Sequence, residues 1–229
     1  MQIHRSIPSQ QIKLLIFDLD GTLIDSRQDL VNSVNAALRS LGRDELPSDE
    51  IAAMVGDGAP ALVRRALGDT VDEGLLRRGL EFFLSYYREH KLDFTRLYDG
   101  IPEALEVLQG SNGARRVMSV LTNKPVNPSR AIVDALGIGE KFVSVYGGNS
   151  FETKKPDPLG INTILAETGV RAEEAVMIGD SAVDILTGRA AGTWTCGVTY
   201  GFAPHTLVDT PGDAVVDTPT ELAAILSSP

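Results

Sequence analysis

Residues 14–26 read Leu-Leu-Ile-Phe-Asp-Leu-Asp-Gly-Thr-Leu-Ile-Asp-Ser, an apolar run that ends in two carboxylates. The four apolar residues at its start are typical of a strand buried inside a parallel sheet. Asp18 and Asp20 follow this strand two positions apart. Burying an ionised carboxylate is costly unless its charge is compensated. The pair therefore requires a cation or a shared proton, unless the segment is an ordinary Asp-Gly turn with solvated acids.

The composition of the chain limits the classes of protein to consider. Its 229 residues carry a formal net charge of −10, which argues against nucleic acid or an anionic membrane surface as a partner. The single cysteine, Cys196, cannot form an intrachain disulfide, which favours an intracellular setting. Residues 1–11 lack the apolar segment of a signal peptide, and no apolar run is long enough to span a membrane. We therefore expect a cytoplasmic protein.

Residues 24 to about 92 show helical periodicity and no convincing strand. Asp25-Ser26 is a candidate N-cap for the first helix, and Gly42 is its expected end. Gly56-Asp57-Gly58 interrupts the helical pattern farther along. The apolar positions that define the first and last helices are Leu30, Val34, Leu38 and Leu41, then Leu76, Leu80, Phe83 and Tyr87. A helical block between the first strand and the rest of the chain predicts an inserted cap.

From Tyr98 onwards the pattern alternates between strands and helices. Apolar runs predict strands at residues 117–121, 142–146, 175–178 and 194–198. Helix-start signals include Asn127-Pro128, Asp157-Pro158 and a capping box at residues 218–221. This alternation predicts an α/β fold with a doubly wound, mainly parallel sheet.

Three of the predicted strands end in polar residues. These endings are residues 18–20, residues 122–124 (Thr-Asn-Lys) and residues 179–181 (Gly-Asp-Ser). In open α/β sheets, ligands bind beyond the carboxyl ends of the strands, where the strand order reverses. We therefore expect these residues to converge on one site.

The segment Asp-Leu-Asp-Gly-Thr-Leu-Ile-Asp-Ser at residues 18–26 resembles the first motif of the haloacid dehalogenase superfamily. The resemblance implies that Asp18 is a nucleophile and that Asp20 is a general acid and then a general base. A carboxylate nucleophile would divide phosphate-ester hydrolysis into two easier steps through an aspartyl-phosphate. One carboxyl group could then protonate the leaving group and later deprotonate the attacking water.

Three further segments resemble the other motifs of this superfamily. Thr122 and Asn123 match the motif that binds the transferring phosphoryl group, and Lys155 matches the lysine that balances its charge. Lys124 is assigned no role. Residues 179–184 match the motif in which Asp180 binds a metal and Asp184 supports it. The resemblance implies Mg²⁺ held by Asp18, Asp20, Asp180 and Asp184, because hard oxygen ligands beside a phosphate suit that ion.

The resemblance covers about residues 14–202 and implies a Rossmann-like core, residues 1–23 and 97–229, with a helical cap at residues 24–96. Within the superfamily, residues 55–67, 147–156 and 197–201 are similar to phosphoglycolate phosphatases, although Asn149 stands where those enzymes commonly have Asp. This similarity implies Mg²⁺-dependent hydrolysis of a small phosphorylated metabolite, 2-phosphoglycolate. Gly56, Gly58 and Arg65 of the cap would then bind the substrate carboxylate. A monomer or a homodimer is expected.

Other functions share parts of this pattern. Dehalogenases of the superfamily lack the second acid and need no metal, so Asp20 argues against that activity. A sugar-phosphate phosphatase or mutase and a pyrophosphatase would share the core motifs and remain open. A receiver-like phosphoacceptor domain, which is not an enzyme, also combines acids with a Thr and a Lys, but it has no need of a cap.

Overall fold

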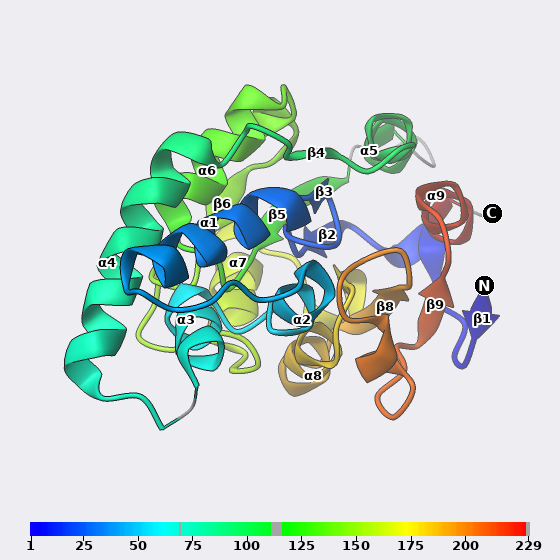
Figure 1. Ribbon diagram of the computed structural model, residues 1–229. Coiled ribbons are helices and arrows are strands. Elements are labelled where there is room, and N and C mark those ends of the chain that lie inside the picture. Colours follow the sequence, from blue (N-terminus) through cyan, green and yellow to red (C-terminus); the bar gives the residue numbers. More distant parts are fainter. Residues whose placement is uncertain (69, 111–115, 228–229) are drawn as a thin grey trace.

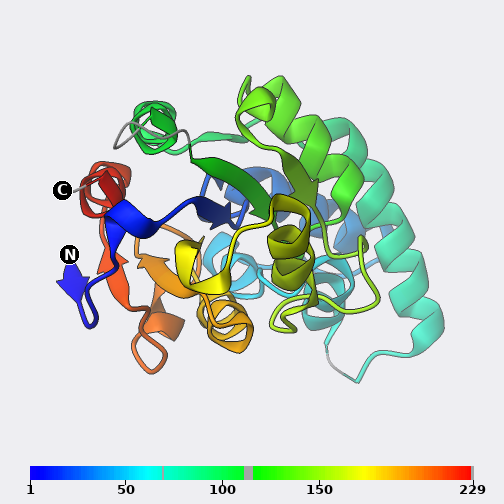
Figure 2. The same cartoon turned by 180° about the vertical axis from the view of Figure 1, so that it is seen from behind.

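A seven-stranded sheet with the order β1-β9-β8-β7-β2-β5-β6 forms the centre of the molecule (Figures 1 and 2). The computed structural model describes residues 1–68, 70–110 and 116–227. Its strands are β1 (Gln2–Ile3), β2 (Leu14–Phe17), β5 (Val117–Leu121), β6 (Ser144–Tyr146), β7 (Ala175–Gly179), β8 (Trp194–Val198) and β9 (Ala214–Val216). All neighbouring strands are parallel except β1, which pairs antiparallel with β9. The predicted mainly parallel sheet is confirmed.

Strand β2 lies between β5 and β7 and is fully buried, as its run of four apolar residues predicts. Its side chains alternate between the two faces of the sheet, because successive residues of a strand point in opposite directions. Leu15 and Phe17 join the cluster that includes α5 and α9, whereas Leu14 and Ile16 pack with α7. The helices of this part are α5 (Ile101–Gly110), α6 (Val126–Ala135), α7 (Leu159–Thr168), α8 (Ala182–Ala191) and α9 (Pro219–Ser227). Both faces of the sheet are therefore covered.

Four helices follow β2 before the chain returns to the sheet, which confirms the expected helical cap. They are α1 (Arg27–Ser40), α2 (Ser48–Ala53), α3 (Ala59–Leu67) and α4 (Glu73–His90), shown in blue to turquoise in Figure 1. A short antiparallel pair, β3 (Ile24–Asp25) with β4 (Arg96–Leu97), lies where the cap begins and ends. The sequence did not predict this pair, because strands of two residues carry no periodicity.

Buried Asp29 of α1 fixes the point at which the chain leaves the cap. Its carboxylate accepts hydrogen bonds from the backbone N–H of Phe94 (3.1 Å), the backbone N–H of Thr95 (2.8 Å) and the Thr95 hydroxyl (2.7 Å). These bonds compensate a carboxylate that is only 1% exposed.

One of the predicted helix starts is wrong in detail, and another is right in position but not in its capping bond. Helix α6 begins at Val126, before the expected Asn127-Pro128 start, because Asn149 Oδ1 accepts a hydrogen bond from the Val126 N–H at 2.8 Å. Ser26 lies at the N-cap of α1, but its hydroxyl makes no capping bond and donates to Asp20 instead. Short 3₁₀ turns occur at Ser9–Gln11, Gly139–Lys141, Ala172–Glu174 and Pro204–Leu207. Within the described residues, no helix combines the length and the apolar character needed to cross a membrane.

Candidate active site

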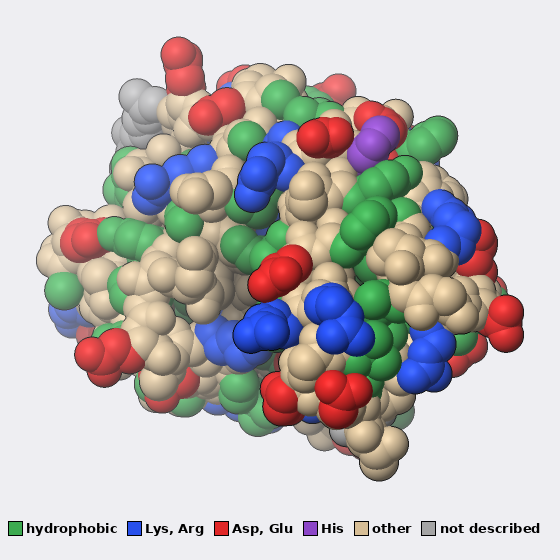
Figure 3. Space-filling view, turned by 60° about the vertical axis from the view of Figure 1, so that its left-hand side comes forward, with side chains coloured by type: hydrophobic (Ala, Val, Ile, Leu, Met, Phe, Trp, Pro, Cys, Tyr) green, Lys and Arg blue, Asp and Glu red, His purple; other side chains and the backbone are tan. Residues whose placement is uncertain are grey.

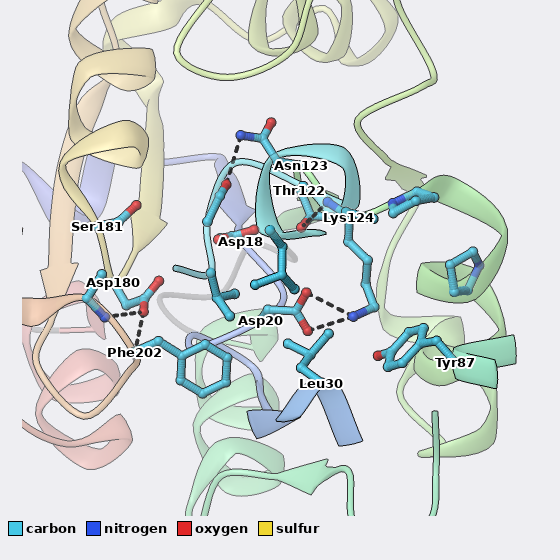
Figure 4. Close-up of a pocket in the computed structure, with 18 of the residues that line it drawn as sticks. Asp18, Asp20, Leu30, Tyr87, Thr122, Asn123, Lys124, Asp180, Ser181 and Phe202 are labelled. Carbon is cyan, nitrogen blue, oxygen red and sulfur yellow. Dashed lines mark hydrogen bonds and ion pairs between the residues drawn. The ribbon is translucent and has the colours of Figure 1, made fainter. Parts of the chain in front are cut away.

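The polar ends of three neighbouring strands meet at one cavity, as the sequence predicted (Figure 4). Asp18 follows β2, Thr122 follows β5 and Asp180 follows β7. They come together because β5 and β7 flank β2 in the sheet. The cap provides the apolar wall of the cavity, from Leu30, Val55, Leu62, Phe83, Leu84 and Tyr87. The cavity therefore lies between the core and the cap.

Lys155 holds two of the predicted acids together at the floor of this site. Its Nζ atom lies 2.9 Å from Asp18 Oδ1 and 2.6 Å from Asp184 Oδ1. The Lys155 side chain is 2% exposed and that of Asp184 is fully buried. An ion pair of this kind is destabilised strongly when one partner is removed, because the other charge is left uncompensated.

The positions of Asp180 and Asp184 are fixed by hydrogen bonds from backbone and hydroxyl donors. Asp180 Oδ2 accepts from the N–H groups of Phe202 (2.6 Å) and Ala203 (3.2 Å). Asp184 Oδ2 accepts from the hydroxyl of Ser181 at 2.7 Å and from its N–H at 3.2 Å, and so closes a capping box at the start of α8. Both carboxylates are therefore held in place by donors of the protein itself.

The site has more negative than positive charge. Burial raises the pKa of Asp18 to about 6, although the Lys155 ammonium opposes this shift. Burial also raises the pKa of Asp180 to about 8, with further contributions from the charges of Asp184 and Asp18. Burial by itself would lower the pKa of Lys155, but Asp18 and Asp184 raise it above its ordinary value. Lys155 therefore stays charged and faces more carboxyl groups than it can neutralise.

The residues at the floor of the site fit a divalent cation. Each of Asp18, Asp180 and Asp184 offers a carboxylate oxygen, and these oxygens lie within 4.8 Å of one another. Asp18 Oδ1 is buried, and the Lys155 ammonium at 2.9 Å is its one close partner given within the described residues, so the carboxylate keeps lone pairs for a cation. Hard oxygen donors of this kind suit Mg²⁺.

Asp20 lies between Ser26 and Lys124, a residue for which no role was predicted from the sequence. The Ser26 hydroxyl donates to Asp20 Oδ1 at 2.5 Å. Lys124 Nζ donates to both oxygens of Asp20, at 3.0 and 2.9 Å, and lies 4.6 Å from the centre of the Tyr87 ring. Burial by itself would lower the pKa of Lys124, but the Asp20 carboxylate raises this pKa above its ordinary value. Tyr87 comes from α4, so this group joins the core to the cap (Figure 4).

The cap loop at residues 55–58 is in direct contact with the core. Asn123 Nδ2 donates to the carbonyl oxygen of Gly56 at 3.0 Å and to that of Lys155 at 3.1 Å. Lys154 Nζ donates to the carbonyl oxygen of Asp57. Gly58 has a φ of +85°, and a Cβ at this position would lie 2.8 Å from the carbonyl oxygen of Asn123. The glycine therefore allows the loop to approach the core closely.

Of the predicted substrate-binding residues, the structure brings all but one to the cavity. Thr122, Asn123, Gly56 and Gly58 line it. The Arg65 guanidinium instead binds the Asp57 carboxylate and, at 2.8 Å, the carbonyl oxygen of Met54. On the face turned forward in Figure 3, lysine and arginine side chains lie beside acidic ones. The expected role of Arg65 is thus not supported by its position.

Comparison with known proteins places the chain in a family. The model of the haloacid dehalogenase-like hydrolases matches residues 15–198, and the chain belongs to this family. It is 40% identical over 195 residues to a phosphoglycolate phosphatase of Pseudomonas syringae pv. tomato, a match that covers 83% of this chain and 70% of the relative. A phosphoglycolate phosphatase of Vibrio parahaemolyticus serotype O3:K6 is 35% identical over 225 residues, with 95% and 97% covered.

A solved structure has the same fold over almost the whole chain. It is that of a predicted phosphoglycolate phosphatase from Haemophilus somnus 129pt, with a TM-score of 0.88 and 30% sequence identity. The alignment covers 94% of this chain and 98% of the other. The Rossmann-like core with a helical cap is thus common to both proteins.

Proposed function

We propose that this hydrolase is a Mg²⁺-dependent phosphatase that cleaves 2-phosphoglycolate through a phosphorylated Asp18. The observation that carries the proposal is the arrangement at the carboxyl ends of β2 and β7. There Asp18, Asp180, Asp184 and Lys155 surround one point beneath a cavity that the cap covers. The names of the relatives support the choice of substrate.

Asp18 and Asp20 divide the chemistry between them. An oxygen of Asp18 attacks phosphorus while the bond from phosphorus to the leaving oxygen breaks, and Asp20 gives a proton to that oxygen. Water then attacks the phosphorus of the aspartyl-phosphate, Asp20 accepts a proton from this water, and the Asp18 carboxylate is released. Asp20 lies at the wall of the cavity, next to Ser26 and Lys124, where a leaving group would lie.

The other residues hold the phosphoryl group and compensate its charge. Lys155 would supply positive charge, and the Thr122 hydroxyl and the backbone N–H of Asn123 would provide hydrogen bonds to the phosphoryl oxygens. The Asn123 side chain would instead keep its two bonds to the carbonyl oxygens of Gly56 and Lys155. Asp18, Asp180 and the backbone of Asp20 would hold Mg²⁺, with Asp184 in support. When bound, this ion would neutralise phosphate charge and orient the group for in-line attack.

The cap would select the substrate by enclosing the leaving group. We place its boundaries at residues 24 and 96, so that residues 1–23 and 97–229 form the catalytic core. A small phosphorylated metabolite is the proposed partner, acted on in the cytoplasm by a monomer or a homodimer.

A panel of small phosphates tests this proposal. Purified protein would be assayed for phosphate release from 2-phosphoglycolate, glucose 1-phosphate, pyrophosphate and p-nitrophenyl phosphate, each with Mg²⁺ and with EDTA. We expect the highest kcat/KM for 2-phosphoglycolate and no turnover in EDTA. The Asp18→Asn variant should be folded and inactive. A preference for another substrate would contradict the proposed specificity, and activity of Asp18→Asn would contradict the proposed nucleophile.

A further inference from the structure

Lys124 is the one cationic side chain among the described residues that line the cavity. Apart from the acids at the floor, the wall is largely apolar, with leucine, phenylalanine and proline side chains. The other lysine of the site, Lys155, is held between Asp18 and Asp184. Arg65 is held by Asp57. An anionic group that enters this cavity beyond the phosphoryl site therefore meets Lys124.

The position of Lys124 is fixed from several sides. Its backbone carbonyl accepts a hydrogen bond from the Gly148 N–H at 2.9 Å. Its side chain is 4% exposed and extends from the end of β5 to Asp20, with the Tyr87 ring beside its Nζ atom (Figure 4). Such a lysine loses little conformational freedom when it binds a ligand, because it is already ordered.

The ammonium of Lys124 carries three N–H bonds, and the oxygens of Asp20 accept two of them. The third faces Tyr87, whose side chain also interacts with this ammonium but whose hydroxyl makes no hydrogen bond of good geometry within the described residues. A ligand oxygen that displaces this weak contact can bind the third N–H group while the bonds to Asp20 persist.

The location of Asp20 sets where the ligand oxygen would lie. A general acid must come within about 2.6–3.2 Å of the leaving oxygen that it protonates. Lys124 Nζ lies within 3.0 Å of both Asp20 oxygens. A negatively charged oxygen two or three bonds beyond the leaving oxygen is thus within reach of Lys124.

From these contacts we infer that Lys124 binds an anionic group on the leaving group and selects substrates that carry one. For 2-phosphoglycolate this group is the carboxylate, so the inference rests on the proposed function for the identity of the substrate. The recognition itself extends to any small phosphate whose leaving group is anionic, which includes pyrophosphate.

A pair of matched substrates separates recognition of the anion from positioning of Asp20. Isobutyl phosphate has two methyl groups in place of the two carboxylate oxygens of 2-phosphoglycolate, so it keeps the shape without the charge. The kcat/KM ratio of the two substrates would be measured for the wild type, Lys124→Met and Lys124→Arg. Lys141→Met is the matched control, because Lys141 pairs with Glu106 outside the cavity.

Loss of one charge-assisted hydrogen bond should lower this ratio by roughly 10- to 100-fold in Lys124→Met. Lys124→Arg should retain more of the ratio, and Lys141→Met should leave it unchanged. Equal losses on both substrates would overturn the inference, because they would mean that Lys124 acts through Asp20 alone.

A binding measurement keeps the test independent of turnover and of the ability of Asp20 to transfer a proton. Calorimetric titration with 3-phosphonopropionate and with its uncharged isostere 3-methylbutylphosphonate should show a selective loss of affinity for the former in Lys124→Met. Urea unfolding would confirm that each variant is folded. If the wild type prefers pyrophosphate, the proposed substrate is wrong. In that case, a selective loss of pyrophosphate cleavage relative to isobutyl phosphate in Lys124→Met would support the inferred role of Lys124. The absence of such a loss would refute that role.

Discussion

Replacing Asp180 by Asn should stabilise the metal-free protein while it abolishes activity. Asp180 is 4% exposed, and its oxygens lie within 4.8 Å of ligand oxygens on Asp18 and Asp184. The single positive charge of Lys155 offsets one of the two negative charges on Asp18 and Asp184. The remaining like-charge pair costs about 3 kcal/mol at this distance and an effective dielectric constant of 20. We expect Asp180→Asn to raise the free energy of unfolding by about this amount at pH 8.

The hydrogen bonds of Asp180 should survive this substitution. The asparagine amide oxygen can take the place of Asp180 Oδ2 and accept from the N–H groups of Phe202 and Ala203. The amide nitrogen then occupies the position of the other oxygen and can donate to the neighbouring carboxylates. The gain in stability should therefore not be offset by a buried donor or acceptor without a partner.

The pH dependence of this gain has a definite sign. The pKa of Asp180 is about 8 in the folded protein and near 3.8 in the unfolded chain. Between these values the folded state holds a proton that the unfolded state has released, so the stability of the wild type falls as pH rises. The difference between Asp180→Asn and the wild type should therefore begin near pH 4, grow with pH and level off above pH 8.

Urea unfolding from pH 4 to pH 9, in EDTA and in Mg²⁺, measures these effects. Mg²⁺ at about 100 times its Kd should stabilise the wild type by about 2.7 kcal/mol and leave Asp180→Asn unchanged. A variant that is no more stable than the wild type at pH 8, or a difference that does not depend on pH, would refute the argument from crowded carboxylates.

Three further substitutions test separate parts of the site. Asp20→Asn should slow the cleavage of alkyl phosphates more than that of p-nitrophenyl phosphate, whose leaving group needs no proton; an equal loss in steady-state kcat would contradict the role of Asp20 as an acid. Lys155→Ala should slow both substrates equally and lower the free energy of unfolding by about 3–5 kcal/mol, because Asp18 and Asp184 lose their shared partner. Urea denaturation that shows no such loss of stability would contradict this role of Lys155. Gly58→Ala should raise KM several-fold, because a Cβ at this position forces the cap loop away from Asn123. Gly42→Ala is the control: it also has a positive φ but open space around it, so it should lower stability and leave KM unchanged. Equal KM values for the two variants would contradict the role of Gly58.

The central part of the fold could be predicted because its signals are local. The apolar run of β2 and the polar residues at three strand ends are read directly from the sequence, and the parallel sheet brings them together. The short strands β1, β3, β4 and β9 could not be found in this way. They consist of two or three residues that are held by their neighbours in space rather than by a pattern of their own.

Side-chain direction was the main limit in the prediction of the site. Lys124 follows Thr122 and Asn123 in sequence, but its partner Tyr87 belongs to the cap, so nothing near it in the chain shows where it points. Arg65 was a reasonable candidate by charge, and it is bound by Asp57 in the same loop that was expected to bind the substrate. Asn149, which departs from the usual Asp, satisfies the first N–H group of α6.

The pairing of β3 with β4 has a consequence for how such enzymes diversify. Ile24 lies opposite Leu97 and Asp25 opposite Arg96, so the chain leaves the core and returns to it at a single point. The entropy of closing such an excursion changes by only about 0.6 kcal/mol for each doubling of its length. Segments of very different size can therefore be exchanged at these residues while β2 and its neighbours keep their register. This junction is the place at which the lid of one relative could be grafted onto the chemistry of another.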